Sequence, residues 1–307
     1  MIARHEPMQT ADGTTVDAFH LDSGAPGPTV AIVAGIHGNE VAGIVALSQL
    51  VREDLDLRAG RVRFVPIAHP AAHAANLRVS PHDGLNLARV FPGDPDGKPT
   101  EQLAALIADR VIAGSDVLID LHTSSPDTDM PFFAGCLDDG SPECALAVAL
   151  CDAFGAGVVW THPEVGVGRT LTTAKEHGIS ALYVESPQGG VLPAPTLSAY
   201  RDGVLRMLAH LGMLADVPAG RATALRLHGN GDVDRAMATT ASGFFVAERS
   251  LLDEVSAGDV IGRVIAHDGS EALVCAAPVD GVITVLRRQA IVAAGDVIFE
   301  LGTRRPA

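Results

Sequence analysis

The residues best suited to chemistry lie in the stretch Thr29–Glu40, which reads TVAIVAGIHGNE. An apolar, β-branched run up to Ala34 predicts a buried strand, and the glycines after it predict a turn. His37 and Glu40 stand in that turn, three residues apart, where a helical pattern begins at Asn39. At this spacing both side chains can point into one pocket at the N-terminus of the helix. An imidazole paired with a carboxylate suits a transition metal, and zinc is the expected ion.

His122 is the third candidate ligand, because it directly follows the apolar run DVLIDL. The carboxyl ends of parallel strands meet at one edge of a sheet, so His122 can reach the ion held by His37 and Glu40. Two imidazoles and one carboxylate leave a position open for water, as a hydrolytic zinc requires. Asp120 lies two residues earlier, on the same side of the strand, where it can accept a hydrogen bond from an imidazole in a second shell around the metal. The sequence therefore predicts one Zn²⁺ per chain.

Glu185 ends another strand pattern, ISALYVE, at the same predicted edge. A metal lowers the pKa of bound water, but the reaction still needs a group that moves protons. A carboxylate beside the metal can accept the proton of the activated water and later deliver it to a leaving amine. Glu185 is therefore the expected general acid/base of a hydrolase.

A long irregular stretch, residues 69–98, supplies further candidates, and long loops in compact domains are usually functional. Arg78 and Arg89 could contact a substrate carboxylate or a tetrahedral oxyanion. Asn86 could position substrate or backbone through its amide.

Strand and helix patterns alternate up to about residue 215, which predicts an α/β fold with a mostly parallel sheet and helices on both faces. Residues 1–20 predict a short entry strand or a hairpin, with Asp12-Gly13 as a turn. The expected strands are 30–34, 61–68, 116–121, 157–160 and 179–185, and the expected helices are 39–52, 100–113, 141–154, 171–177 and 196–211.

The pattern changes near residue 216, beyond which no helix is evident and short strands alternate with Gly-Asp and Asp-Gly turns. A repeat is present: SGFFV leads to AGDVI after Ser242, and DGVIT leads to AGDVI after Asp280. Two similar halves predict a small all-β sandwich or barrel with pseudo-two-fold symmetry. We therefore expect two domains, 1–215 and 216–307. The second would cap the cleft or make a subunit contact, so a homo-oligomer is compatible with the sequence.

The composition limits the partners. The 307 residues are 47% hydrophobic and 19% charged, with a net charge of −15, which argues against binding to nucleic acid or an anionic membrane. An anionic substrate would then need local arginines. The N-terminal residues lack the apolar core of a signal peptide, no apolar run is long enough to span a bilayer, and the four cysteines form no C-x-x-C pair. These features predict a cytoplasmic protein.

Four motifs in order, GIHGNE, DGLNLARVFPG, IDLHT and YVESPQGG, resemble the succinylglutamate desuccinylase/aspartoacylase family of the zinc carboxypeptidase-like superfamily. They cover roughly residues 30–190, and the C-terminal repeat is similar to the β domain that many members carry. The resemblance implies a zinc-carboxypeptidase-like catalytic domain followed by a barrel-sandwich-like domain. It also implies the roles of the candidates: His37, Glu40 and His122 bind zinc, Glu185 is catalytic, Arg89 grips a substrate carboxylate, and Arg78 polarises the scissile carbonyl.

Two departures from the family pattern fall in regions expected to contact substrate. Ala88 stands between Leu87 and Arg89 where the family has asparagine, and Ser186-Pro187-Gln188 separates Glu185 from the following glycines. Both leave the expected metal chemistry intact and leave the acyl group and the amino acid open.

The sequence favours a zinc-dependent amidohydrolase that cleaves a small anionic N-acyl amino acid into a carboxylate and a free amine. One alternative is a zinc carboxypeptidase acting on peptides or a peptidoglycan stem, which would differ in access to the cleft. Another is a non-catalytic metal- or ligand-binding protein. The C-terminal repeat resembles biotinyl/lipoyl carrier domains, but the chain has no lysine after Lys175 to carry such a group. Iron or cobalt could also occupy the site.

Overall fold

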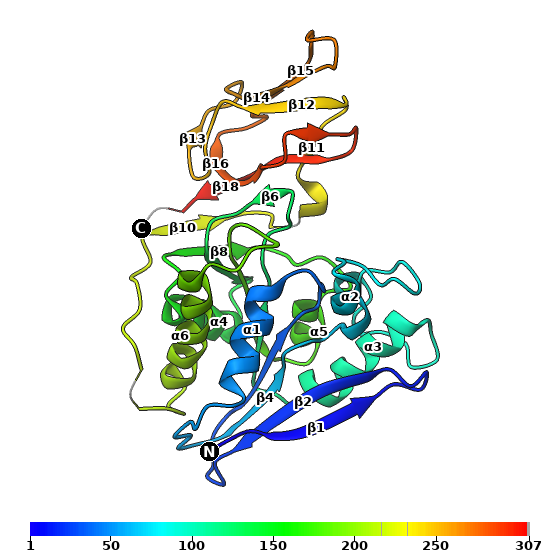
Figure 1. Cartoon of the computed structure of the whole chain (residues 1–307). Coiled ribbons are helices and arrows are strands. Elements are labelled where there is room, and N and C mark those ends of the chain that lie inside the picture. The colour runs from blue at the N-terminus through cyan, green and yellow to red at the C-terminus, as the bar shows by residue number, and fades with distance from the viewer. Residues whose placement is uncertain (216, 232, 306–307) are drawn as a thin grey trace.

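The computed structural model describes residues 1–215, 217–231 and 233–305. Four parallel strands form its centre, hydrogen-bonded in the order β4-β3-β5-β9 (Figure 1). They are β3 (Thr29–Ala34), β4 (Arg61–Val65), β5 (Val117–Leu121) and β9 (Ser180–Glu185). β3 and β5 are buried almost throughout, which explains why the sequence shows them as unbroken apolar runs. The expected α/β fold with a mostly parallel sheet is confirmed at this centre.

Helices cover both faces of the sheet. They are α1 (Val41–Leu50), α2 (Pro70–Ala75), α3 (Pro99–Ile107) with a π-helical continuation (Ala108–Ile112), α4 (Pro142–Phe154), α5 (Thr170–Glu176) and α6 (Ala194–His210). α1, α4 and α6 share one core with the sheet, and α3 and α5 share another. Alternate residues of β3 enter the two cores: Val30 and Ile32 belong to the first, and Ala31 and Val33 belong to the second.

The order of the central strands reverses between β3 and β5. The chain leaves β3 through α1 to reach β4 on one side, and then crosses through α3 to reach β5 on the other side. In such sheets the crevice outside the carboxyl ends of the two strands is where ligands bind. His37 and His122 both emerge at this crevice, because they follow β3 and β5.

Beyond β9 the sheet is mixed rather than parallel. β7 (Phe133–Leu137), which the sequence did not suggest, is antiparallel to β9, and β8 (Val158–His162) and β10 (Leu225–His228) run parallel to β7. The expected N-terminal hairpin is present as β1 (Arg4–Gln9) and β2 (Thr15–Asp22). The stretch 69–98 was expected to be irregular throughout. It instead contains α2 and a 3₁₀ turn (Leu87–Arg89).

The C-terminal strands pair in a way that reflects the sequence repeat. β12 (Gly243–Ala247) pairs with β14 (Val260–Ile265), as β16 (Gly281–Arg287) pairs with β18 (Val297–Arg304). β12 also pairs with β17 (Ile291–Val292) of the second half, and β16 pairs with β13 (Glu254–Val255) of the first. The remaining strands are β6 (Thr128–Asp129), β11 (Met237–Ala238) and β15 (Glu271–Ala276), and a 3₁₀ turn spans Val233–Arg235. Each half of the repeat thus contributes a short strand that pairs with a strand of the other half.

The C-terminal strands stand at the end of the molecule opposite the N-terminal hairpin (Figure 1). β10 connects the two regions, because it pairs with β8 on one side and with β18 on the other. The division into two domains stays a prediction, and its boundary, residue 216, lies outside the described residues. Among the described residues, no helix has the length and apolar character needed to cross a membrane.

Candidate active site

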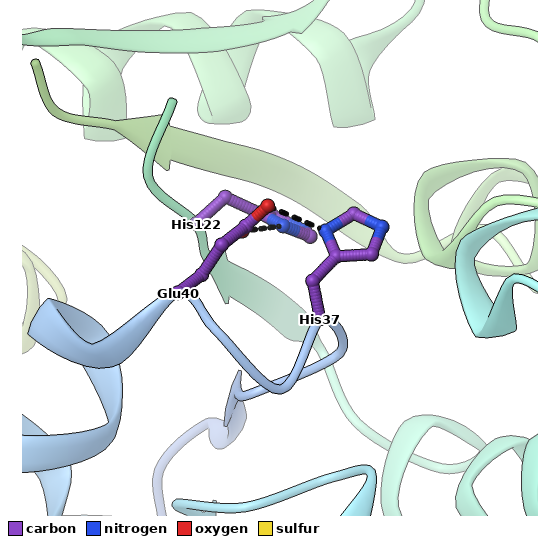
Figure 2. A group of neighbouring side chains, drawn as sticks. All are labelled: His37, Glu40 and His122. Atoms are coloured by element: carbon purple, nitrogen blue, oxygen red, sulfur yellow. Dashed lines mark hydrogen bonds and ion pairs between the residues drawn. The ribbon is translucent and has the colours of Figure 1, made fainter. Parts of the chain in front are cut away.

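The three predicted metal ligands lie together at the crevice between β3 and β5 (Figure 2). Their ligand atoms all lie within 4.8 Å of one another. His37 Nδ1 is 2.7 Å from Glu40 Oε1, and His122 Nδ1 is 2.9 Å from Glu40 Oε2. All three side chains are buried. Residues 82 positions apart in the sequence therefore reach one point, as the strand-end argument predicts.

The turn that carries His37 and Glu40 packs against α2. Gly38 packs so tightly on this helix that an added Cβ would lie 2.1 Å from the Ala72 carbonyl carbon. His73 Nδ1 lies 2.9 Å from the Gly38 carbonyl oxygen, so it donates a hydrogen bond there. Glu40 is the residue before the first turn of α1, which begins two residues later than the sequence pattern suggests. This close packing requires glycine at position 38 and fixes the orientation of both ligands.

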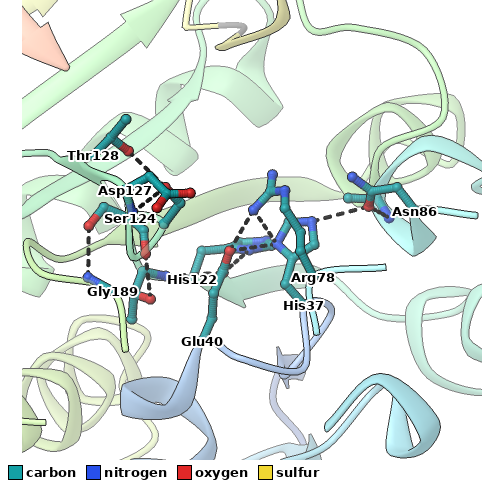
Figure 3. A network of polar contacts seen from close by, with 12 residues as sticks. His37, Glu40, Arg78, Asn86, His122, Ser124, Asp127, Thr128 and Gly189 are labelled. Carbon is teal, nitrogen blue, oxygen red and sulfur yellow. Dashed lines mark hydrogen bonds and ion pairs between the residues drawn. The ribbon is translucent and has the colours of Figure 1, made fainter. Parts of the chain in front are cut away.

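Asn86 fixes the tautomer of His37. Its Oδ1 accepts a hydrogen bond from the Ala88 backbone N–H at 2.9 Å, so the orientation of the amide is determined. The same oxygen lies 3.1 Å from His37 Nε2, which must therefore carry a proton and donate it (Figure 3). Burial lowers the pKa of His37 to about 4, so the ring is neutral near pH 7 and its Nδ1 is bare. Asn86 was predicted to contact substrate, and the described residues that line the cavity do not include it.

This tautomer places two hydrogen-bond acceptors face to face. The bare Nδ1 of His37 and the carboxylate oxygen of Glu40 are only 2.7 Å apart, and neither has a proton to share. Arg78 Nη1 lies 2.8 Å from that oxygen and 3.2 Å from that nitrogen, so a positive group stands where the two lone pairs converge. A cation is what such a pair of acceptors requires, and nitrogen and oxygen donors suit zinc.

His122 lies against Asp120, whose role beside a bound metal stays a prediction. Its Nε2 lies 3.1 Å from Asp120 Oδ2, which also accepts a hydrogen bond from Thr170 Oγ1 at 2.6 Å. This arrangement leaves Nδ1 directed at Glu40. A histidine ligand that donates its other N–H to a carboxylate is the usual arrangement at zinc sites.

The charge balance among the three side chains centres on Glu40. Burial opposes ionisation, but the neighbouring His37 and His122 outweigh it and lower the pKa of Glu40 well below its usual value. Burial likewise opposes the charge on His122, yet Asp120 and Glu40 together raise its pKa well above 6.5. His122 is therefore protonated near neutral pH, and a metal ion would have to displace that proton.

Glu185 lies beside this cluster in a cavity of about 130 Å³. The cavity is also lined by His37, Arg78 and His122. Burial, followed by the charge of Glu40, raises the pKa of Glu185 to about 8. Its Oε2 is buried and has no hydrogen-bond partner among the described residues, so it remains available to a ligand.

Arg89 lines the same cavity, but it is paired with a residue from the C-terminal region. Its Nε and Nη2 bind the two carboxylate oxygens of Asp234 at 2.8 and 3.0 Å. Arg169, also in the lining, lies 3.3 Å from the same carboxylate. Two guanidinium groups thus hold one carboxylate at the cavity.

The residues after Glu185 pack on the loop that follows His122. Gly189 donates its N–H to Ser124 Oγ at 3.0 Å, and a Cβ at Gly189 would lie 1.8 Å from the Ser124 carbonyl oxygen (Figure 3). The same loop supplies the Thr123 N–H that donates to Glu40 Oε2 at 3.1 Å. The Ser-Pro-Gln insertion therefore ends in a glycine whose position is dictated by backbone contact.

Sequence reasoning missed four residues of this cavity or its mouth: Arg169, Asp234, His162 and Tyr183. Arg169 stands before a short helix, and Asp234 lies 145 residues from its partner Arg89, so no local spacing connects them. His162 and Tyr183 lie on β8 and β9, which run in opposite directions, so the rule that parallel strands end at one edge does not bring them together. The sequence feature that could have pointed to them is a histidine and a tyrosine on strands that are otherwise largely apolar.

Comparison with known proteins identifies the family. Residues 26–211 match the succinylglutamate desuccinylase/aspartoacylase catalytic domain. The chain belongs to this family. The resemblance carried by the four sequence motifs is thereby confirmed.

Relatives extend the match over nearly the whole chain. The chain is 33% identical over 283 residues to an N-alpha-acetyl-L-2,4-diaminobutyric acid deacetylase of Halomonas elongata, covering 89% of this chain and 81% of that protein. It is 32% identical over 173 residues to a succinylglutamate desuccinylase of Serratia proteamaculans, covering 52% of each. The product-bound ectoine utilization protein EutE (DoeB) of Ruegeria pomeroyi has a similar structure, with a TM-score of 0.86 and 26% identity over 98% of this chain and 94% of that one.

Proposed function

We propose that this protein is a zinc-dependent hydrolase that cleaves the amide bond of a small N-acyl amino acid. The observation that carries the proposal is the pair of acceptors formed by His37 Nδ1 and Glu40 Oε1, 2.7 Å apart, with the tautomer of His37 fixed by Asn86. Arg78 Nη1 contacts both atoms, and a bound metal ion would satisfy the same two lone pairs in its place. Membership of a family that contains desuccinylases and deacetylases supports the chemical class.

His37, Glu40 and His122 would hold the metal, with Asn86 and Asp120 orienting the two imidazoles. When bound, zinc supplies a Lewis acid for the acyl carbonyl and lowers the pKa of a coordinated water to about 7. The donor set of two nitrogens and one carboxylate leaves an open position for this chemistry.

Glu185 is the group that moves protons. It lines the cavity beside the ligands, and its pKa of about 8 without metal places it close to the working range of a general acid/base. As a carboxylate it takes a proton from the attacking water, and as a carboxylic acid it donates that proton to the nitrogen of the leaving amine.

Three arginines bind and polarise the substrate. Arg78 is near enough to the ligand cluster to donate to the scissile carbonyl oxygen, where negative charge develops in the transition state. Arg89 and Arg169 already hold the carboxylate of Asp234, which indicates that their natural ligand is a carboxylate of the substrate.

The size of the cavity favours this function over a carboxypeptidase. A volume of about 130 Å³ suits a small molecule, and Gly231 and Val233 from the C-terminal region form part of its wall. A peptide would need an extended groove in that position. The expected capping role of the C-terminal region is consistent with these contacts.

Glu185→Gln tests the mechanism. The variant keeps the shape of the side chain and all three metal ligands, so we expect about one zinc per chain, as in the wild type. Hydrolysis of N-acetyl amino acids, measured as released amine, should fall by about a thousandfold. Glu164→Gln is a matched control, because Glu164 also lines the cavity but pairs with Arg235 at 3.0 Å. Full activity of Glu185→Gln would exclude Glu185 from the mechanism.

A further inference from the structure

Two polar residues, the buried His162 and the half-buried Tyr183, line the cavity without a role in the chemistry proposed above. His162 is the last residue of β8, and Tyr183 lies on β9, two residues before Glu185. Their rings are stacked, with centroids 5.7 Å apart. The Tyr183 hydroxyl lies 2.8 Å from His162 Nε2, and His162 Nδ1 lies 2.8 Å from the Gly229 carbonyl oxygen. A chain of two hydrogen bonds therefore connects the backbone of the C-terminal region to the cavity.

The direction of both hydrogen bonds follows from their ends. A carbonyl oxygen can only accept, so His162 Nδ1 carries the proton that is donated to Gly229. Burial lowers the pKa of His162 to about 4, so the ring is neutral near pH 7 and its Nε2 is bare. Tyr183 must then donate its hydroxyl proton to Nε2. Burial, and then the charge of Glu185, raises the pKa of Tyr183 well above its usual value, so the phenol keeps that proton.

This chain of donors leaves the Tyr183 oxygen with lone pairs and no proton to offer. Glu185, the next residue on the same face of β9, lines the same cavity, but its carboxyl group exchanges protons in the proposed reaction and is not a fixed acceptor. A substrate N–H or O–H donor would satisfy the Tyr183 oxygen. A second substrate carboxylate would meet an oxygen that has no proton to donate, which discriminates against it.

The backbone on either side prevents the two rings from turning away. A Cβ on Gly231 would lie 2.1 Å from His162 Cε1, so this segment lies directly against the imidazole. A Cβ on Gly135 of β7 would lie 2.4 Å from the Tyr183 ring. Glycine at both positions leaves just enough space for the two rings. This packing keeps His162 and Tyr183 in the orientation that sets the direction of both hydrogen bonds.

We propose that His162 and Tyr183 determine substrate specificity by selecting an N-acyl amino acid whose side chain ends in a hydrogen-bond donor, such as an amine. The pair discriminates against a side chain that ends in a second carboxylate. This inference rests on the proposed hydrolase function and adds the class of amino acid. Arg89 and Arg169 would bind the single α-carboxylate, so the substrate carries one carboxylate and one donor group.

Three acetylated amino acids of matched size test the proposal on the zinc-loaded protein. Nα-acetyl-2,4-diaminobutyrate ends in an amine, N-acetylnorvaline replaces the amine with a methyl group, and N-acetylaspartate ends in a carboxylate. We expect kcat/KM of the wild type to be at least about tenfold higher for the amine than for either of the others. Tyr183→Phe should lower kcat/KM for the amine by about ten- to a hundredfold and change that for norvaline by less than about twofold.

Two further variants complete the experiment. Thr161→Val removes a buried hydroxyl one residue from His162, where it contacts Leu227 and His228, and should leave all three rates unchanged. His162→Phe removes the acceptor and frees the Tyr183 proton, so the rate for N-acetylaspartate should rise relative to that for the amine. Equal wild-type rates for amine and norvaline would overturn the proposal, as would an equal loss on all three substrates in Tyr183→Phe.

If none of the three compounds is hydrolysed, the hydrolase proposal has failed for acetylated substrates, and binding then tests the specificity pair separately. Calorimetric titration of the zinc-loaded protein with free 2,4-diaminobutyrate and with norvaline provides that measurement. Tighter binding of the diamine to the wild type, lost in Tyr183→Phe, would support the pair. Equal binding of the two amino acids would overturn it.

Discussion

Replacing Asn86 with alanine distinguishes a metal-positioning role from the substrate-binding role predicted from sequence. The structure places Asn86 Oδ1 on His37 Nε2 and on the Ala88 N–H, at 3.1 and 2.9 Å. If Asn86 contacts substrate, its loss raises KM and leaves metal affinity unchanged. If it fixes the tautomer of His37, its loss weakens metal binding and leaves KM of the metal-saturated protein unchanged.

The size of the effect follows from these two contacts. Removing a partner that orients a metal-binding histidine weakens metal affinity by about 10- to 100-fold, or about 1.4 to 2.7 kcal/mol. Alanine also leaves the buried His37 N–H without an acceptor and removes the cap of the 3₁₀ turn at Leu87. A lost cap lowers the free energy of unfolding by about 1 kcal/mol. Asn86→Asp keeps an acceptor for both donors, so its metal affinity should stay close to that of the wild type.

Competition with a chromophoric chelator at fixed pH measures the zinc affinity, and kinetics at saturating zinc measure KM. Ser141→Ala is a matched control, because Ser141 caps α4 by accepting from the Cys144 N–H at 3.3 Å, and α4 carries none of the three candidate metal ligands. It should show a similar loss of stability and no change in zinc affinity. Zinc affinity of Asn86→Ala within twofold of wild type, together with a raised KM, would refute the tautomer argument.

Two further predictions concern charge. Asp120 and Glu40 raise the pKa of His122 against the effect of burial, so zinc must displace a proton from this ring. The apparent zinc affinity should therefore rise about tenfold per pH unit above pH 6.5, until the pH passes the pKa of His122 in the folded protein. A flat chelator-competition profile from pH 6.5 to 7.5 would contradict this. Asp234→Asn removes the carboxylate that is paired with Arg89, so KM should fall about two- to fivefold with kcat unchanged. The effect is modest because the Asp234 side chain is 56% exposed and solvent weakens its ion pair with Arg89. Glu164→Gln serves as its control, and a raised KM in Asp234→Asn would mean that the pair holds Arg89 in place rather than blocking it.

The sequence was sufficient to predict that His37, Glu40 and His122 lie together, because each of them follows a buried parallel strand. Such strands read as unbroken apolar runs, and their carboxyl ends share one edge of the sheet. The position of Asp120, on the same side of β5 as His122, followed from strand alternation alone. These predictions depend only on local pattern and on the direction of the strands.

The role of Asn86 could not be predicted, because it depends on which amide atom faces His37. That orientation is set by the Ala88 N–H, a contact between residues two positions apart in a turn that the sequence showed only as loop. β7 was missed for a different reason: its sequence, FAGCL, includes two small residues and has little β propensity. Gly135 is needed there because Tyr183 occupies the space that a side chain would fill.

The C-terminal region is part of the site rather than an appendage to it. The segment between β10 and β11 supplies the Gly229 carbonyl that polarises His162, the Gly231 backbone that packs on the same ring, and the Asp234 carboxylate that occupies Arg89. β10 itself is hydrogen-bonded to β8, so truncation near residue 216 would remove a strand from the main sheet and leave a new edge. Loss of activity on truncation would therefore not distinguish capping from folding. Single substitutions that alter one contact at a time, such as Tyr183→Phe and Asp234→Asn, are the appropriate way to separate the contribution of this region to specificity from its contribution to the fold.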